Sequence, residues 1–126
     1  MSVPEKKVYY MGIARNQIVL ADFAKSHKPK YQQSTNEIIS KFGSGDGIIP
    51  FNEMEYAVKN ESNSGGMLYL MLVEKGYYQP KAFRGLERMK QDFEKFFDRH
   101  QIANSRYLSL NKEFEGSFDR IYVYTI

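Results

Sequence analysis

The chain of 126 residues contains no cysteine. This absence excludes disulfides, a thiolate metal site, a cysteine nucleophile and any site for palmitoyl or prenyl attachment. The N-terminal stretch "MSVPEKK" has no apolar signal-peptide core, and Ser2 stands where N-myristoylation requires glycine. We therefore expect a soluble protein that faces the cytosol.

Long apolar runs and charge of a single sign are also missing. The longest apolar run is Met67 to Val73, whereas a membrane-spanning helix needs about 20 residues. The net charge is +3, but acids and bases alternate, as in "RGLERMKQDFEKFFDRH", which is typical of a solvated helix face. The one basic cluster, Lys25 to Lys30, is short; we favour a solvated loop over a contact with lipid headgroups or phosphates. No nucleic-acid partner is expected.

The chain does carry enough apolar residues for a core. Hydrophobic residues make up 42% and aromatic residues 15% of the sequence, which argues against disorder. The length fits one compact domain spanning residues 1–126. No internal repeat, low-complexity tract or linker divides it.

The N-terminal third shows a strand pattern followed by a helix pattern. Residues 7–14 and 17–24 are rich in aromatic and β-branched side chains and flank Arg15 and Asn16, which predicts a β-hairpin. Beyond Pro29 the spacing becomes helical as far as Gly43, which predicts the first helix. Its apolar stripe contains Tyr31, Thr35, Ile38, Ile39 and Phe42.

Three more strands and two helices follow. Residues 48–52 form a predicted edge strand, because Pro50 cannot donate a ladder hydrogen bond. Residues 54–59 alternate cleanly and predict a strand with one covered face. Residues 67–73 are apolar at every position, so a strand formed by them would be apolar on both faces. From Pro80 to His100 the period is helical, and a shorter helix is predicted near the C-terminus. The two apolar stripes contain Phe83, Leu86, Met89, Phe93, Phe96 and Phe97, and then Leu110, Phe114, Phe118, Ile121 and Tyr122.

This order, β-β-α-β-β-β-α-α, predicts an α+β fold. Strands joined by short turns are antiparallel neighbours. A strand that is apolar on both faces needs cover on both sides, so residues 67–73 are predicted to be the central strand. We expect a five-stranded antiparallel sheet, sandwiched by one helix on one face and two on the other.

No pattern in the sequence indicates catalysis. His27 and His100 are far apart and lack partners at metal-ligand spacing. The stretch "GSGDG" (residues 43–47) follows a helix and opens a strand, the reverse of a phosphate-binding loop. No serine is framed as a nucleophile elbow, and the acids of residues 92–98 lie on a charged helix face. We predict no catalytic, cofactor-binding or metal-binding residue, and no enzymatic activity.

Three stretches carry a resemblance to a known family. The opening "VYYMGIARNQIVLADFA" resembles the start of longin domains, the N-terminal regulatory domains of vesicle R-SNAREs (synaptobrevin-like proteins). The block "LYLMLVEKGYYQPKAFRGLERMKQDFEKFF" is similar to the central strand, corner and helix of that family. The last stretch, "SRYLSLNKEFEGSFDRIY", resembles the endoplasmic reticulum–Golgi branch of R-SNAREs. The resemblance covers nearly the whole chain and implies a longin- or profilin-like fold.

The resemblance also implies regulation by binding. Longin domains hold their own SNARE segment, or a trafficking partner, in a groove between the first helix and the third strand. Carried over to this sequence, the groove would be lined by Ile38, Phe42, Ile49 and Phe51, together with Tyr31. The expected partners are a SNARE motif and coat or tethering proteins at the cytoplasmic face of endoplasmic reticulum, Golgi or transport vesicle membranes.

Two functional readings stay open on this fold. The favoured one is a regulatory domain of an R-SNARE-type trafficking protein. The alternative is a small longin-fold subunit of a coat adaptor or tethering complex, without a SNARE motif. The sequence up to Ile126 contains no SNARE heptads and no apolar anchor, so we expect it to be either part of a longer SNARE or a longin protein that lacks a SNARE motif. Membrane association is expected only through segments absent from this chain.

Overall fold

The computed structural model describes residues 7–42, 45–61 and 66–125. Its strands are β1 (Val8–Arg15), β2 (Ile18–Phe23), β3 (Gly47–Phe51), β4 (Met54–Glu61) and β5 (Met67–Glu74). Its helices are α1 (Lys28–Ile38), the 3-10 helix η1 (Ile39–Lys41), α2 (Gln79–Phe96), α3 (Arg99–Ala103) and α4 (Asn111–Thr125).

The five strands form one antiparallel sheet in the order β2-β1-β5-β4-β3. The predicted central position of β5 is confirmed, since β5 pairs with β1 on one side and with β4 on the other. The predicted edge position of the strand that contains Pro50 is confirmed as well, because β3 pairs only with β4 in the described sheet.

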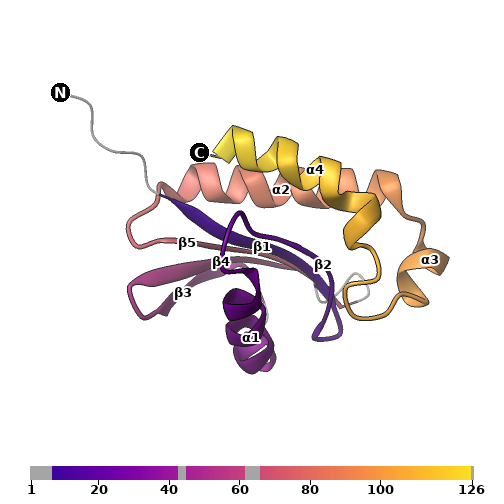
Figure 1. The fold of residues 1–126 in the computed structure, drawn as a ribbon, viewed down its shortest axis with the longest axis horizontal. Coiled ribbons are helices and arrows are strands. Elements are labelled where there is room, and N and C mark those ends of the chain that lie inside the picture. The colour runs from indigo at the N-terminus through magenta and orange to yellow at the C-terminus, as the bar shows by residue number, and fades with distance from the viewer. Residues whose placement is uncertain (1–6, 43–44, 62–65, 126) are drawn as a thin grey trace.

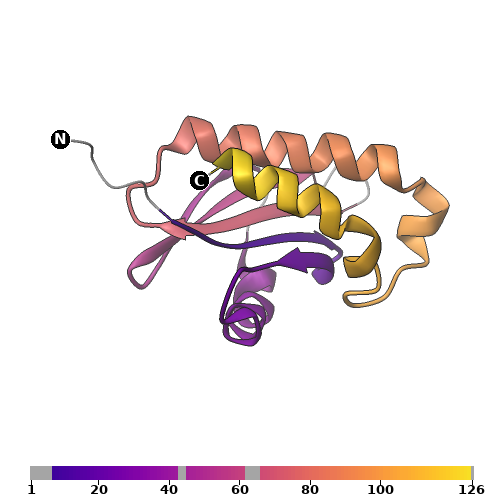
Figure 2. The ribbon, with the colours of Figure 1, turned by 45° about the horizontal axis from the view of Figure 1, so that its top comes forward.

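Helices cover both faces of the sheet. Figures 1 and 2 show α1 on one face and the antiparallel helices α2 and α4 on the other. Side chains of a strand alternate between the faces, and β5 follows this rule: Tyr69 and Met71 belong to the core under α2 and α4, whereas Leu68 and Leu70 belong to the core under α1. The predicted α+β fold is therefore confirmed, and its layers are consistent with a longin-like fold.

A glycine allows α2 to approach both the sheet and α4 closely. A Cβ atom added at Gly85 would lie 2.9 Å from Cε of Met71 in β5 and 3.0 Å from Cγ2 of Thr125 in α4. These separations are shorter than ordinary van der Waals contacts, so a larger residue at this position would require the Met71 and Thr125 side chains to shift.

The β1–β2 turn lies one residue later than the sequence suggested. The turn residues are Asn16 and Gln17, with φ of 50° and 69°, and Arg15 pairs with Ile18 as the last residue pair of the hairpin. Two positive φ values define the tight turn whose twist matches that of the strands. Asparagine adopts this conformation readily, whereas glutamine does so at a steric cost.

Replacing Gln17 by glycine is therefore expected to stabilise the protein. The exposed Gln17 side chain has little to lose, and glycine adopts a positive φ without the steric penalty of a Cβ atom. We expect the free energy of unfolding to rise by about 1 kcal/mol, as measured by urea denaturation. Gln17→Ala is the control, because it keeps the Cβ atom and should bring no gain. Equal stability of the glycine and alanine variants would contradict this account of the turn.

The helix predicted to continue to His100 ends at Phe96 instead. Phe97 is extended, and Asp98 begins the short helix α3, where its Oδ1 accepts a hydrogen bond from the backbone N–H of Gln101 at 2.8 Å. A carboxylate that can cap a new helix competes with continuation of the old one. The first α-helix also ends earlier than predicted, at Ile38. One 3-10 turn, η1, follows it as far as Lys41.

The segment that connects α3 to α4 covers the outer edge of β2. The backbone N–H groups of Leu108 and Leu110 donate to the carbonyl oxygens of Val19 and Leu20, at 2.8 and 3.0 Å. One edge of the sheet is thereby closed, whereas no described strand pairs with the outer edge of β3. Within the described ranges, no helix is long and apolar enough to cross a membrane.

Candidate functional site

The open edge strand β3 presents alternate side chains to opposite faces of the sheet. Ile49 and Phe51 pack against the core under α1, whereas Ile48 packs against the core under α2 and α4. Ile49 and Phe51, both named above as groove residues, therefore lie on the α1 face of the sheet. Pro50 is exposed, as is acceptable at an edge where no backbone N–H is needed.

A buried tyrosine joins β3 to the end of the first helical segment. The Tyr56 ring of β4 is fully buried, and its centroid lies 5.4 Å from that of Phe42 and 5.5 Å from that of Phe51. Its hydroxyl shares a 3.0 Å hydrogen bond with Oγ1 of Thr35 in α1. Burial raises the pKa of Tyr56, which keeps the hydroxyl protonated for this contact. Tyr56 thus contacts both Phe42 and Phe51.

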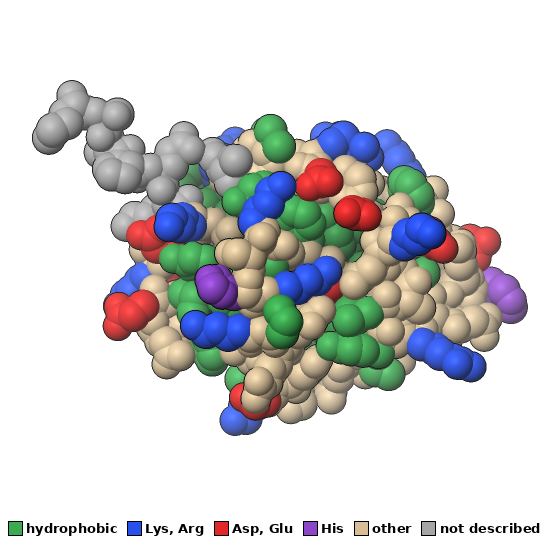
Figure 3. Space-filling model, in the orientation of Figure 1, with side chains coloured by type: hydrophobic (Ala, Val, Ile, Leu, Met, Phe, Trp, Pro, Cys, Tyr) green, Lys and Arg blue, Asp and Glu red, His purple; other side chains and the backbone are tan. Residues whose placement is uncertain are grey.

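Around this ring lies a patch of partly exposed apolar side chains. Ile38, Phe42, Ile49 and Phe51 each pack on the core beneath α1 while part of the side chain remains accessible. We call these four residues, with Tyr56 beneath them, the α1–β3 surface. Figure 3 shows that the molecular surface around α1 mixes hydrophobic with basic side chains.

The structure separates the fifth predicted site residue from this surface. Tyr31 is only 7% exposed, and its ring lies against Tyr9 and Tyr10 of β1, at centroid distances of 5.9 and 6.4 Å. Because β1 is separated from β3 by β5 and β4, Tyr31 is a core residue beneath the N-terminal part of α1. The interpretation of Tyr31 as part of the groove lining is corrected accordingly.

Polar contacts hold α1 in place as much as apolar ones do. Within α1, only Tyr31 and Thr35 are buried. Asn36 donates to the Tyr107 hydroxyl at 3.0 Å, and Gln32 donates to the Asp22 carboxylate at 2.8 Å. The helix is therefore positioned by a few specific hydrogen bonds, which tie it to β2 and to the segment that precedes α4.

Asp22 in β2 is the centre of a buried network that the sequence did not reveal. Its side chain is fully buried and accepts hydrogen bonds from Tyr10 at 3.0 Å and from Asn111 at 3.0 Å, besides the one from Gln32. Lys28 forms an ion pair with it at 3.1 Å. In return, the Asn111 amide oxygen accepts from the Asp22 backbone N–H at 2.6 Å. Asp22 thus joins α1 and α4, which lie on opposite faces of the sheet.

The electrostatics of this network keep the phenol of Tyr10 neutral. Burial, together with the neighbouring Asp22 carboxylate, raises the pKa of Tyr10 well above its usual range, so that the phenol remains a donor. The signal in the sequence was a single acid inside the apolar stretch "IVLADFA". An acid in a buried strand requires partners, but its partners come from residues up to 89 positions away.

The basic segment 25–30 is largely engaged within the protein. Lys28 pairs with buried Asp22, and Lys25 pairs with Asp119 at 3.7 Å and lies 5.2 Å from the Tyr122 ring centroid. Among the described residues there is also no group of three or more His, Asp or Glu side chains that could hold a metal ion. What the α1–β3 surface offers is apolar and aromatic contact beside a strand edge with which no described strand pairs.

No protein-family model matches this chain, and no curated protein matches it at a significant level.

Proposed function

We propose that this chain is a non-enzymatic regulatory longin domain of an R-SNARE-type vesicle trafficking protein. In this proposal, the α1–β3 surface binds a SNARE segment or another trafficking partner and thereby controls fusion and sorting. The resemblance of the three sequence stretches to longin domains gives the class of partner. The proposed place of action is the cytoplasmic face of endoplasmic reticulum, Golgi or transport vesicle membranes.

The observation that carries the proposal is the difference between the two edges of the sheet. The outer edge of β2 is covered by residues 108–111 of the same chain, whereas β3 pairs with no second strand among the described residues. Proteins usually cover or blunt an edge that is not used, and an uncovered edge can accept an extended peptide. Partly exposed apolar side chains lie directly beside this edge.

The chemistry of the α1–β3 surface defines the partner it would select. Ile38, Phe42, Ile49 and Phe51 would accept apolar anchors, and the Tyr56 ring fixes the relative position of the two phenylalanines. Interfaces of this kind draw most of their affinity from a few anchors in preformed pockets. A SNARE segment, which presents a stripe of apolar side chains, would supply such anchors.

Replacing both Ile49 and Phe51 by serine should therefore weaken binding at least tenfold, which corresponds to about 1.4 kcal/mol. The binding measurement is fluorescence anisotropy of a labelled R-SNARE motif peptide titrated with the domain. A melting curve of each variant is needed, because both side chains also pack on the core.

A matched double substitution elsewhere on the surface serves as the control. Ile18 and Tyr78 are 48% and 65% exposed, and Ile18→Ser with Tyr78→Ser removes one aliphatic and one aromatic side chain outside the α1–β3 surface. This control should bind the peptide like the wild type. A folded Ile49→Ser, Phe51→Ser protein that also binds as tightly as the wild type would exclude the α1–β3 surface as the binding site.

A further inference from the structure

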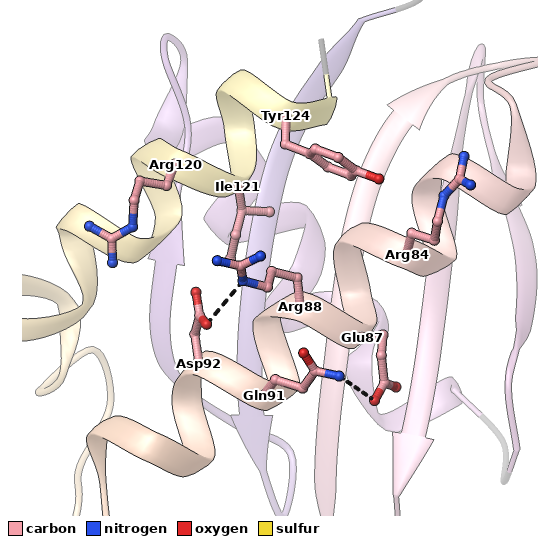
Figure 4. A pocket seen from close by; sticks show the side chains of 8 residues that line it. All are labelled: Arg84, Glu87, Arg88, Gln91, Asp92, Arg120, Ile121 and Tyr124. Carbon is pink, nitrogen blue, oxygen red and sulfur yellow. Dashed lines mark hydrogen bonds and ion pairs between the residues drawn. The ribbon is translucent and has the colours of Figure 1, made fainter.

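A second candidate site lies on the opposite layer of the molecule, between α2 and α4. The cleft there has a volume of about 320 Å³. Figure 4 shows its walls, with side chains from α2 along one side and from α4 along the other. The cleft is lined by Arg84, Glu87, Arg88, Gln91, Asp92, Arg120, Ile121 and Tyr124.

Each of the two carboxylates of the cleft has a basic partner, and the lysine that pairs with Glu87 is shared with Asp46 and Glu61. Asp92 accepts from Nε of Arg88 at 3.1 Å. Glu87 pairs with Nζ of Lys59 in β4 at 3.4 Å and accepts from the Gln91 amide at 3.4 Å. Neither acid pairs with the two remaining arginines of the cleft.

Those two arginines, Arg84 and Arg120, form no ion pair with any carboxylate among the described residues. Arg120 donates from Nη2 to the hydroxyl of Ser117 at 3.1 Å, which orients the guanidinium without neutralising it. Both side chains are exposed. The cleft thus has an excess of positive charge at two separate positions.

An apolar surface separates the two charges. Ile121 is 2% exposed and forms part of the floor, whereas Tyr124 is 55% exposed and extends from α4 over the cleft. In Figure 4, Arg84 lies beside Tyr124, and Arg120 lies at the other end, beside Asp92. Arg84 and Asp92 are eight positions apart on α2, so the two ends are roughly 12 Å apart at 1.5 Å per residue.

We infer that this cleft binds a short acidic peptide segment in an extended conformation, with two carboxylates that flank an apolar side chain. An extended chain advances about 3.3 Å per residue and points every second side chain to the same side. Acids four residues apart are therefore about 13 Å apart and face the cleft together with the residue midway between them. The distance between the two peptide carboxylates therefore matches the distance between the Arg84 end and the Arg120 end of the cleft. The apolar residue between the acids would pack on Ile121 and Tyr124.

The separation of the arginines favours a peptide over a single anion. One phosphate or carboxylate could reach only one end of the cleft, where a single guanidinium in water binds weakly. A peptide bridges both ends in one binding event, and its second contact then forms at high effective concentration. The inference is independent of the α1–β3 surface, because the sheet lies between the two sites.

The test uses a fluorescent seven-residue peptide with glutamate at its second and sixth positions, leucine at its fourth and alanine elsewhere. Binding to the whole domain is measured by anisotropy at low salt. We expect Arg84→Gln and Arg120→Gln each to weaken binding at least fivefold, and the double variant at least twentyfold. A peptide with glutamine in place of both glutamates should bind the wild-type domain as weakly as the original peptide binds the double variant. Added salt should weaken the complex of the original peptide with the wild-type domain.

The control variant is Arg99→Gln, which removes one exposed positive charge outside the cleft and should change binding less than twofold. The Ile49→Ser, Phe51→Ser protein should also bind the acidic peptide like the wild type. The test of this cleft is therefore separate from the test of the proposed function. Equal losses for Arg99→Gln and Arg84→Gln would overturn the inference, as would the absence of peptide binding. Binding of phosphatidylserine vesicles that depends on Arg84 and Arg120, without peptide binding, would equally overturn the peptide assignment.

Discussion

The Asp22→Ala protein is expected to lose about 3–5 kcal/mol of its free energy of unfolding. The substitution removes the acceptor of three side-chain hydrogen bonds and one ion pair. The side chain of Lys28 is 36% exposed and can turn to water. Tyr10 is buried, so its hydroxyl would be left without an acceptor, and an unsatisfied buried donor costs about 1–3 kcal/mol by itself.

Part of this loss of stability should come from the contact with α1 and part from the contact with α4, because Asp22 contacts Gln32 of α1 and Asn111 of α4. A double-mutant cycle separates the two contributions. We expect Asp22→Ala to show a coupling energy of about 0.5–3 kcal/mol with Gln32→Ala and, separately, with Asn111→Ala. Stability is measured by urea denaturation of the four proteins in each cycle.

The matched control is Asp119→Ala. Asp119 pairs with Lys25 at 3.7 Å, but both side chains are more than half exposed, and exposed pairs contribute at most about 1 kcal/mol. Asp119→Ala should therefore be nearly as stable as the wild type. If Asp22→Ala were no less stable than Asp119→Ala, the network around Asp22 would have no role in joining the layers.

The central position of β5 could be predicted because the strand is apolar on both faces, which is a local property of the sequence. Pro50 placed residues 48–52 at the edge of the sheet for a local reason as well. The ends of the helices were harder to predict from the sequence. Asp98 could either continue the exposed face of α2 or cap a new helix, and only the packing of Phe97, which is 3% exposed, shows that the chain turns there.

The candidate site was predictable only in part, for a related reason. Ile49 and Phe51 were assigned to the correct face because the period of a strand is two. Tyr31 and Phe42 belong to one predicted helical stripe, yet the first lies over β1 and the second beside β4. An apolar stripe predicts which side of a helix is buried, but it does not predict which strands lie beneath that helix. The partners of Asp22, and the cleft between α2 and α4, depend on tertiary contacts in the same way.

Truncation of Phe93 to alanine is the second large effect that we expect, again about 3–5 kcal/mol. Phe93 lies in the last turn of α2, is fully buried, and packs its ring against Phe97 and Phe114 at centroid distances of 4.9 and 5.5 Å. Removal of the ring leaves a cavity between α2 and α4 that the rigid sheet beneath cannot close. For a domain of this size, the melting temperature should fall by roughly 10 °C or more.

Phe96→Ala provides the matched control on the same helix. The sequence placed Phe96 on the apolar stripe with Phe93, but the structure leaves it 52% exposed at the last turn of α2. Its ring contacts Phe97 and Phe114 only from outside, at 5.5 and 6.0 Å, so its truncation should cost about 1 kcal/mol or less. Thermal unfolding followed by circular dichroism measures both variants. Equal melting temperatures for Phe93→Ala and the wild type would mean that this stripe is not the core, and that the α2–α4 layer packs on the sheet in another way.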